Sequence, residues 1–249
     1  MELRALRRIV RLWLENRTGK FRKCLVVNGV VLITTKKGRA DKTTVTYSNN
    51  TTFSDPMMMP KFQNTYGNMT GEMMSWGLET DKRYDPANFF NTGSNVSNAL
   101  SLSTGNDKSQ SYISVATTNA TGIMPNNDYD RYNFSFRNTT NFLNNKFILD
   151  TSANYIIQND KNMVSQGQYF NPLTSLYLFP RGEDFSDVAV YERYDDLSGV
   201  NTQYWPYGDL GGVSSQNPYW IMNRMNREND RRRYKLAASL QYNIITFVY

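Results

Sequence analysis

The fold is decided by the stretch Tyr132-Asn-Phe-Ser-Phe-Arg-Asn-Thr-Thr-Asn-Phe142, in which large apolar and polar side chains alternate. Successive side chains of a β-strand point to opposite faces, so this pattern predicts a strand with one apolar and one polar face. The apolar set is Tyr132, Phe134, Phe136 and Phe142, and the polar set is Asn133, Ser135, Arg137, Thr139 and Asn141.

The same alternation recurs along the chain. The run Ser111–Asn119 is less regular, because it has apolar residues on both faces: Ile113 and Val115 on one, Tyr112 and Ala116 on the other. A run of about ten residues with period two is long enough to cross a bilayer in a tilted barrel. The sequence therefore predicts about six strands. The five further runs are Thr43–Phe53, Leu100–Ser103, Ser111–Asn119, Phe147–Ile157 and Tyr234–Ile244.

The connections between these runs alternate between long loops and tight turns. An up-and-down barrel, with loops on one rim and turns on the other, produces this parity, whereas the Greek-key crossings of a soluble sandwich do not. We therefore predict an all-β, antiparallel up-and-down transmembrane β-barrel fragment that is open. In order, the connections are 54–95, 105–108, 120–130, 143–145 and 158–231.

Composition and charge narrow the class of protein. No run of about 18 apolar residues occurs, which argues against a transmembrane helix. Residues 1–27 hold eight of the 28 Lys and Arg but two of the 22 Asp and Glu, which leaves 20 of each for the rest of the chain. A nucleic-acid-binding surface needs basic residues clustered on the folded part. We therefore expect no nucleic-acid partner.

The residue inventory also limits catalysis and metal binding. Histidine is absent and Cys24 is the single cysteine, so neither a Ser–His nor a Cys–His pair can be assembled, and no disulfide can form within the chain. Acidic residues at Asp107, Asp128 and Asp130 do not have the spacing of a calcium loop. We expect no enzyme activity, no cofactor and no metal site.

The N-terminal segment, residues 1–27, differs from the rest. Leu3, Leu6, Val10, Trp13 and Leu14 recur at helical spacing with arginines between them, which predicts a short amphipathic helix rather than a signal peptide. Two interpretations remain: a membrane-surface helix, or, as we favour, a tail foreign to the fold.

Four ordered motifs resemble the SusC/RagA family of TonB-linked outer-membrane proteins. The first, Asn28-Gly-Val-Val-Leu-Ile-Thr-Thr-Lys-Lys-Gly38, is similar to the motif that closes the family's plug domain. The others, in order, are Lys61-Phe-Gln-Asn-Thr-Tyr-Gly67, Thr121-Gly-Ile-Met-Pro-Asn-Asn-Asp128 with Arg131-Tyr-Asn-Phe134, and Asn217-Pro-Tyr-Trp220 with Asn223-Arg224.

The resemblance implies a 22-stranded barrel in the cell outer membrane that imports oligosaccharides or peptides. Its partners are a SusD-like surface lipoprotein, the TonB complex and the outer-membrane lipid. On this basis residues 28–42 are the C-terminal end of the plug, and 43–249 are the N-terminal part of the barrel with long extracellular loops at 54–95 and 158–231.

The chain departs from the family pattern at its start, where Phe21-Arg-Lys-Cys-Leu-Val-Val27 stands in place of a small-residue stretch. Six strands do not close a barrel of this size. We therefore expect a partial importer, in which the TonB-contacting region lies in the part that is missing. The alternative is a surface-exposed β-rich adhesin or binding protein.

Aromatic residues of the longest loop are the candidate substrate contacts. Flat rings stack on sugar C–H surfaces, and loops carry function more often than the elements they join. The competing interpretation is that these rings fold the loop onto itself, contact the lid or form an interfacial girdle. Methionines around Met57 and Met69 are expected to be adaptable packing at a partner contact. The candidate substrate contacts are Tyr204, Trp205, Tyr207, Tyr219 and Trp220.

Overall fold

The computed structural model describes residues 38, 42–82, 84–144, 146–165, 167, 169–207 and 215–243. The chain divides into two units, Met1–Lys36 and Lys37–Tyr249, and all described residues belong to the second. The predicted N-terminal helix lies outside the described residues, as does the predicted plug end apart from Gly38 and Lys42.

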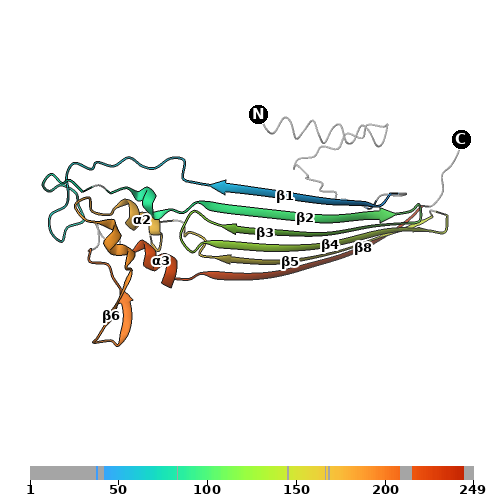
Figure 1. The fold of residues 1–249 in the computed structure, drawn as a ribbon. Helices are drawn as coiled ribbons and strands as arrows, with labels where there is room; N and C mark the ends of the chain where they lie inside the picture. The colour runs from blue at the N-terminus through green and yellow to red at the C-terminus, as the bar shows by residue number, and fades with distance from the viewer. Residues whose placement is uncertain are drawn as a thin grey trace, which may run out of the picture. The chain divides into compact units, whose positions relative to one another are not determined.

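Six long strands form one antiparallel sheet in the order β1-β2-β3-β4-β5-β8, so each pairs with the long strand before it in the chain (Figure 1). The sheet is not closed, because β1 and β8 each pair on one side only within the described residues. The strands are β1 Thr44–Ser54, β2 Gly93–Gly105, β3 Ser109–Thr121, β4 Asp128–Phe142, β5 Phe147–Lys161 and β8 Glu228–Tyr242.

This architecture confirms the predicted all-β, up-and-down, open six-stranded arrangement. The connections 55–92 and 162–227 are long and 106–108 and 143–146 are tight turns, but the third connection, predicted at 120–130, is shorter than expected at 122–127. The strands are longer than the runs read from the sequence, mainly at the loop end. In β2, for example, pairing begins at Gly93, where Ser54 is the partner residue. Polar residues such as Asn95 and Ser97 extend the ladder there, because backbone pairing does not require apolar side chains.

The register assigns each side chain to one of two faces. Residues directly opposite each other on paired strands project to the same side, so they form rows across the sheet. We call the face that carries the following two rows the apolar face. One row is Val45, Leu102, Ile113, Phe136, Ala153 and Leu236, and the next is Tyr47, Leu100, Val115, Phe134, Tyr155 and Tyr234.

The opposite side, which we call the polar face, carries hydroxyl, amide and charged groups. Across all six strands its rows include Thr46, Ser101, Ser114, Ser135, Asn154 and Lys235. Near the turn end, Arg137 donates from Nε and Nη2 to the two carboxylate oxygens of Asp150 at 2.9 and 2.5 Å. The two side chains are 16% and 18% exposed.

The apolar face, not the polar one, is the more exposed. On β4, Phe134 and Phe136 are 43% and 42% exposed, whereas Thr139 on the polar face is 9% exposed. Residues of the apolar face on the two edge strands are more exposed still: Val45 is 65% exposed and Tyr234 is 77% exposed. This order is the reverse of an antiparallel sheet in a water-soluble protein, in which the apolar face is the covered one.

Aromatic side chains lie at the turn end and in the middle of the apolar band. At the turn end, the Phe147 ring lies 6.3 Å from Phe142 and 4.6 Å from Tyr242. In the middle of the strands, Phe134 stacks on Tyr155 at 6.4 Å. From Phe147 to Ile157 the strand rises roughly 34 Å, or about 26 Å when tilted by ~40°. That is comparable to the ~25 Å apolar band of outer-membrane barrels.

Short elements occupy the long connections, and the sequence patterns did not predict them. They are η1 Pro86–Phe89, α2 Pro172–Tyr177, η2 Phe185–Ala189, α3 Pro218–Arg224 and a hairpin of β6 Glu192–Asp195 with β7 Val200–Gln203. No helix in the described part of the chain is long and apolar enough to span a membrane.

The contribution of the Arg137–Asp150 ion pair to the stability of the sheet can be measured by substitution. Replacement of Asp150 by Asn leaves a guanidinium without its carboxylate in a site that is mostly covered, and we expect a loss of about 1–3 kcal/mol in the free energy of unfolding. Urea titration measures this change. The double variant R137Q/D150N should recover part of the loss, and strictly additive single-variant effects would show that the two side chains are not coupled.

Candidate functional site

The loop layer is formed by the connections 55–92, 122–127 and 162–227, which leave and re-enter the same end of the sheet (Figure 1). It holds the hydrophobic core of the described residues, whereas the sheet itself contributes almost none. Side chains of the core include Phe89, Leu176, Phe179 and Val188, each at most 1% exposed. Complete burial of such a side chain stabilises by about 1.5–3 kcal/mol.

Aromatic rings supply four of the nine buried side chains of this core. Tyr84 lies 4.9 Å from both Phe179 and Phe185, and Phe89 meets Tyr219 edge-on at 5.0 Å. The Tyr84 hydroxyl donates to the Leu176 carbonyl at 2.7 Å, which satisfies the one polar atom of its ring. Burial raises the pKa of Tyr84 far above its ordinary value, so this hydroxyl remains a donor at any physiological pH.

Asx residues start each short helix, three of them with a following proline. In Asp85-Pro86, Asn171-Pro172 and Asn217-Pro218, the side-chain oxygen accepts a backbone N–H of the first turn. Proline fixes the helical φ at the first position, where its missing N–H costs nothing. The starts of these helices are thus specified locally, by the caps.

Asn217 is the central polar residue of the layer and is fully buried. Its Oδ1 accepts from the backbone N–H groups of Tyr219 and Trp220 at 2.8 and 3.3 Å. Its Nδ2 donates to the carbonyls of Val188 and Tyr204 at 2.7 and 2.9 Å. One amide therefore fastens α3 to two other segments of the same loop.

A second buried amide, Asn162, joins the layer to the sheet where β5 ends. Its Nδ2 donates to the carbonyls of Asn126 and Met222, both at 2.9 Å, and its Oδ1 accepts from the Arg227 backbone at 2.9 Å. Asn162 has a φ of 52°, a left-handed conformation that asparagine tolerates better than most residues.

The first and last long loops meet at Arg181, which is 5% exposed. Its guanidinium carbon lies 4.4 Å from the Phe62 ring centre and 4.7 Å from that of Tyr84, and its Nη2 donates to the Tyr177 carbonyl at 3.2 Å. Burial lowers the pKa of Arg181 from its ordinary value. Next to it, the Gly182 N–H donates to Asn68 Oδ1 at 3.0 Å.

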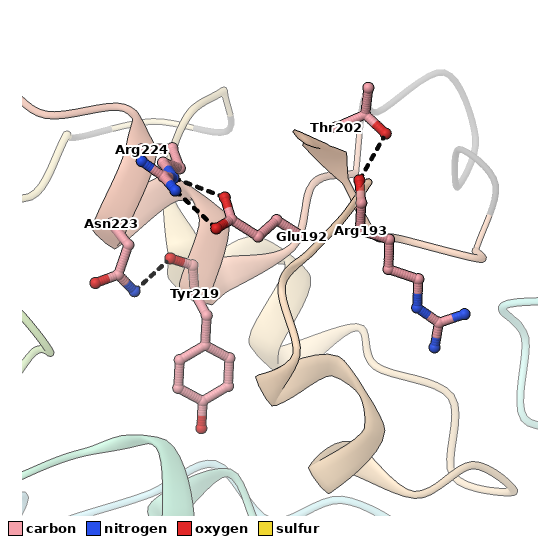
Figure 2. Close-up of polar contacts among 6 residues, drawn as sticks. All are labelled: Glu192, Arg193, Thr202, Tyr219, Asn223 and Arg224. Atoms are coloured by element: carbon pink, nitrogen blue, oxygen red, sulfur yellow. Dashed lines mark hydrogen bonds and ion pairs between the residues drawn. The ribbon is translucent and has the colours of Figure 1, made fainter. Parts of the chain in front are cut away.

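The hairpin β6–β7 is held to α3 by a bidentate ion pair, which Figure 2 shows. Arg224 donates from Nε and Nη2 to the two Glu192 oxygens, each at 2.7 Å. In the same view Arg193 points away from that pair; its guanidinium lies 3.4 Å from the Tyr204 ring centre. At the tip, Leu197 is 98% exposed.

The candidate substrate contacts are distributed between the core and its margin. Trp205, Tyr207 and Tyr219 pack against the buried core. The other two lie apart: Tyr204 lies beneath Arg193, and Trp220 pairs with Tyr191 at 6.5 Å. The five rings therefore do not form one platform, and three of them have a packing role. Their contact with substrate stays a prediction.

Exposed apolar side chains gather on the first long loop. Gly67 N–H donates to the Leu78 carbonyl at 2.9 Å and Thr80 N–H to the Thr65 carbonyl at 3.0 Å, which closes residues 65–80 into a hairpin-like segment. We call the exposed side chains of this loop the methionine-rich surface. They are Met57, Met58, Met69, Met74, Trp76 and Leu78, which are 59–88% exposed.

Sequence reasoning missed the buried amides and the hairpin anchor. The Asn-Pro and Asp-Pro pairs could have located the helix starts, since an Asx cap followed by proline is a known helix-start signal. Nothing in the sequence marks the partners of Asn162 or the pairing of Glu192 with Arg224, because these contacts depend on tertiary placement.

Asn217→Ala should loosen the loop layer. The substitution removes the two hydrogen bonds that cap α3 and the two hydrogen bonds to Val188 and Tyr204, all at a fully buried site. We expect a loss of about 2–4 kcal/mol in local stability. Limited proteolysis should show faster cleavage within residues 162–227. The exposed Asn201 serves as the matched control, and equal cleavage of N201A and N217A would contradict the assignment.

The hairpin anchor should respond to acid. The Arg224 guanidinium holds the pKa of Glu192 below its ordinary value of 4.5. A lowered pKa in the folded state means that the anchor is intact above about pH 4.5 and is lost as pH falls through the lowered value. The protection of the β6 and β7 amides against hydrogen exchange, measured relative to their intrinsic exchange rates at each pH, should therefore fall in acid.

Glu192→Gln should lower the protection of these amides already at neutral pH and remove much of the pH dependence of that protection. The remaining dependence comes from Asp195, whose pKa is lowered by hydrogen bonds from Ser198 and the Leu197 backbone. Exchange rates in E192Q that match the unmodified chain at pH 7 would show that the ion pair does not hold the hairpin.

Comparison of the sequence with models of known protein families gives no match, and comparison with characterised proteins gives none either.

Proposed function

We propose that this chain is part of a TonB-linked outer-membrane importer of the SusC/RagA type, and that it supplies a section of barrel wall with its extracellular loops. The observation that carries the proposal is the exposure of an apolar face that extends over all six strands, opposite a polar face. Outer-membrane barrels alternate lipid-facing apolar and lumen-facing polar residues in this way.

A water-soluble adhesin does not account for this face. Contiguous exposed apolar patches above a few hundred Å² are rare on monomeric soluble proteins. The exposed set extends from Val45 on one edge to Tyr234 and Leu236 on the other. Aromatic residues at the turn end of the band, Phe142, Phe147 and Tyr242, resemble the girdle that outer-membrane barrels place at a membrane interface.

The open edges support the same proposal. A barrel removes edges by closing, so β1 and β8 would each pair with a further strand of a larger sheet. The parity of the connections agrees, since extracellular loops are long and periplasmic turns short in this class. By the resemblance, energy for import comes from the TonB complex.

The loop layer is the proposed site of contact with a SusD-like lipoprotein. Methionine side chains are flexible and polarisable, so they adapt to partner surfaces, and exposed tryptophan is common at interfaces. The methionine-rich surface, with Trp76 82% exposed, supplies both kinds of residue. Oligosaccharide or peptide would pass beneath such a lid, and Tyr204 and Trp220 are the candidate contacts at the margin of the core.

Two neighbouring residues on β3 give the sharpest test. Ile113 lies on the apolar face and Ser114 on the polar face of the same strand. In chain refolded into detergent micelles or bilayers, Ile113→Lys should cost roughly 2–4 kcal/mol of unfolding free energy. The matched control Ser114→Lys should cost less than about 1 kcal/mol. Urea titration in lipid measures both.

A soluble adhesin predicts the opposite result. On a water-facing surface Ile113→Lys would be neutral or would improve solubility, and the chain would fold cooperatively in plain buffer. Either outcome would rule out the barrel assignment and leave the binding-protein alternative.

A further inference from the structure

The charged side chains of the sheet are divided unevenly between its faces, although two basic residues, Lys161 and Arg232, lie on the apolar face. On the polar face, Arg131 on β4 and three basic residues of β8 have no carboxylate partner among the described residues. Arg131 and Arg231 share one row, separated by Gln158 of β5. We call these four residues the basic column: Arg131, Arg231, Arg233 and Lys235.

The two carboxylates on the same face are already occupied. Asp150 forms the bidentate pair with Arg137. Asp160 accepts from Gln158 Nε2 at 3.3 Å and from Asn229 Nδ2 at 2.8 Å, so amides rather than cations satisfy its oxygens. The polar face therefore carries an excess of positive charge that its own acids do not neutralise.

The remaining acids of the strands lie on the other face. Asp128, Asp130, Glu228 and Asp230 line a depression at the loop end of the sheet, together with Lys161 and with Asp160 of the polar face. Because side chains alternate along a strand, the first four of these carboxylates point away from the basic column. Among the described residues, no three His, Cys, Asp or Glu side chains are placed so that they could hold a metal ion together.

The geometry of the basic column suits an extended polyanion. Alternate residues of β8 are about 7 Å apart along the strand, and Arg131 lies about 10 Å away across β5. Between them, β5 presents the amides of Gln158 and Asn154 and the apolar side chain of Ile156. The same rows continue over the polar face with Ser97, Thr118, Asn133 and Ser135.

Such hydroxyls and amides match sugar hydroxyls, and Ile156 is the one apolar side chain of β5 between the basic residues. We therefore infer that the polar face binds a polyanionic oligosaccharide, of the uronate or sulfate type, along the basic column. The inference rests on the proposed function, which makes the polar face the lining of the transport path. It narrows the substrate from oligosaccharide or peptide to an acidic glycan.

The test measures binding to the full chain in detergent. The probes are a sulfated hexasaccharide, an oligogalacturonate of the same length, neutral maltohexaose and a short poly-glutamate. We expect the two anionic sugars to bind at least tenfold more tightly than the neutral one, and the difference to shrink as salt screens the charges. R231Q/R233Q/K235Q should weaken anionic binding by roughly tenfold or more.

The matched control is K42Q/K108Q/K161Q, which removes the same charge outside the polar face and should change affinity less than about twofold. Arg131→Gln tests a different strand and should weaken the same probes, whereas R231K/R233K should retain binding. Circular dichroism confirms that the variants fold.

Three outcomes would overturn the inference: equal binding of maltohexaose, equal binding of poly-glutamate, or unchanged affinity in the triple variant. The Ile113–Ser114 comparison uses no ligand, so a failure of the proposed function is recognised separately.

Discussion

The two-residue period of the β-strand is the constraint on which the rest of this structure depends. Once the ladder β1-β2-β3-β4-β5-β8 is set, each side chain is fixed to one face, and a shift of one residue would exchange the faces completely. The rows through Ile113 and Ser114 show how thoroughly the chain obeys this rule. Apolar groups, hydroxyls and charges are sorted across six strands by backbone geometry alone, and the sheet needs no hydrophobic core of its own.

The loop layer is stabilised differently. Its segments have little regular structure, so many backbone groups would lack partners without help from side chains. Buried amides supply those partners: Asn217 and Asn162 each donate and accept, and each joins segments far apart in sequence. The aromatic core around Phe179 then fills the space between. A rigid layer of this kind can present exposed groups, such as Trp76 and the hairpin tip, at fixed positions.

The sequence predicted the part of the fold that is periodic. Alternation located all six long strands, and the lengths of the connections indicated their up-and-down order, because both signals are local. The sequence did not predict β6, β7, α2 or α3. These elements are too short for periodicity, and they depend on caps and on contacts such as Glu192 with Arg224.

The distribution of charge between the two faces could not be predicted from the sequence either. A count over the body of the chain is balanced, and that count concealed the difference between the faces. Arg231, Arg233 and Lys235 share a face only because of the register. Likewise, the aromatic residues of the long loop were recognisable as a group, but their division between core and margin follows from packing around Phe179 and Phe185.

The two edges of the sheet differ in a way that matters for how such a wall is assembled. β8 carries Arg231, Arg232, Arg233 and Lys235, charges that discourage pairing with unintended strands. β1, with the sequence TVTYSNNTTFS, has no charge and no proline, and its burial pattern is exposed almost throughout. Among the described residues nothing pairs with its outer edge, so the backbone groups of β1 can pair with any strand that reaches them. A second copy of β1 is one such strand. Aggregation is therefore avoided best when β1 is paired early in assembly and β8 is paired later.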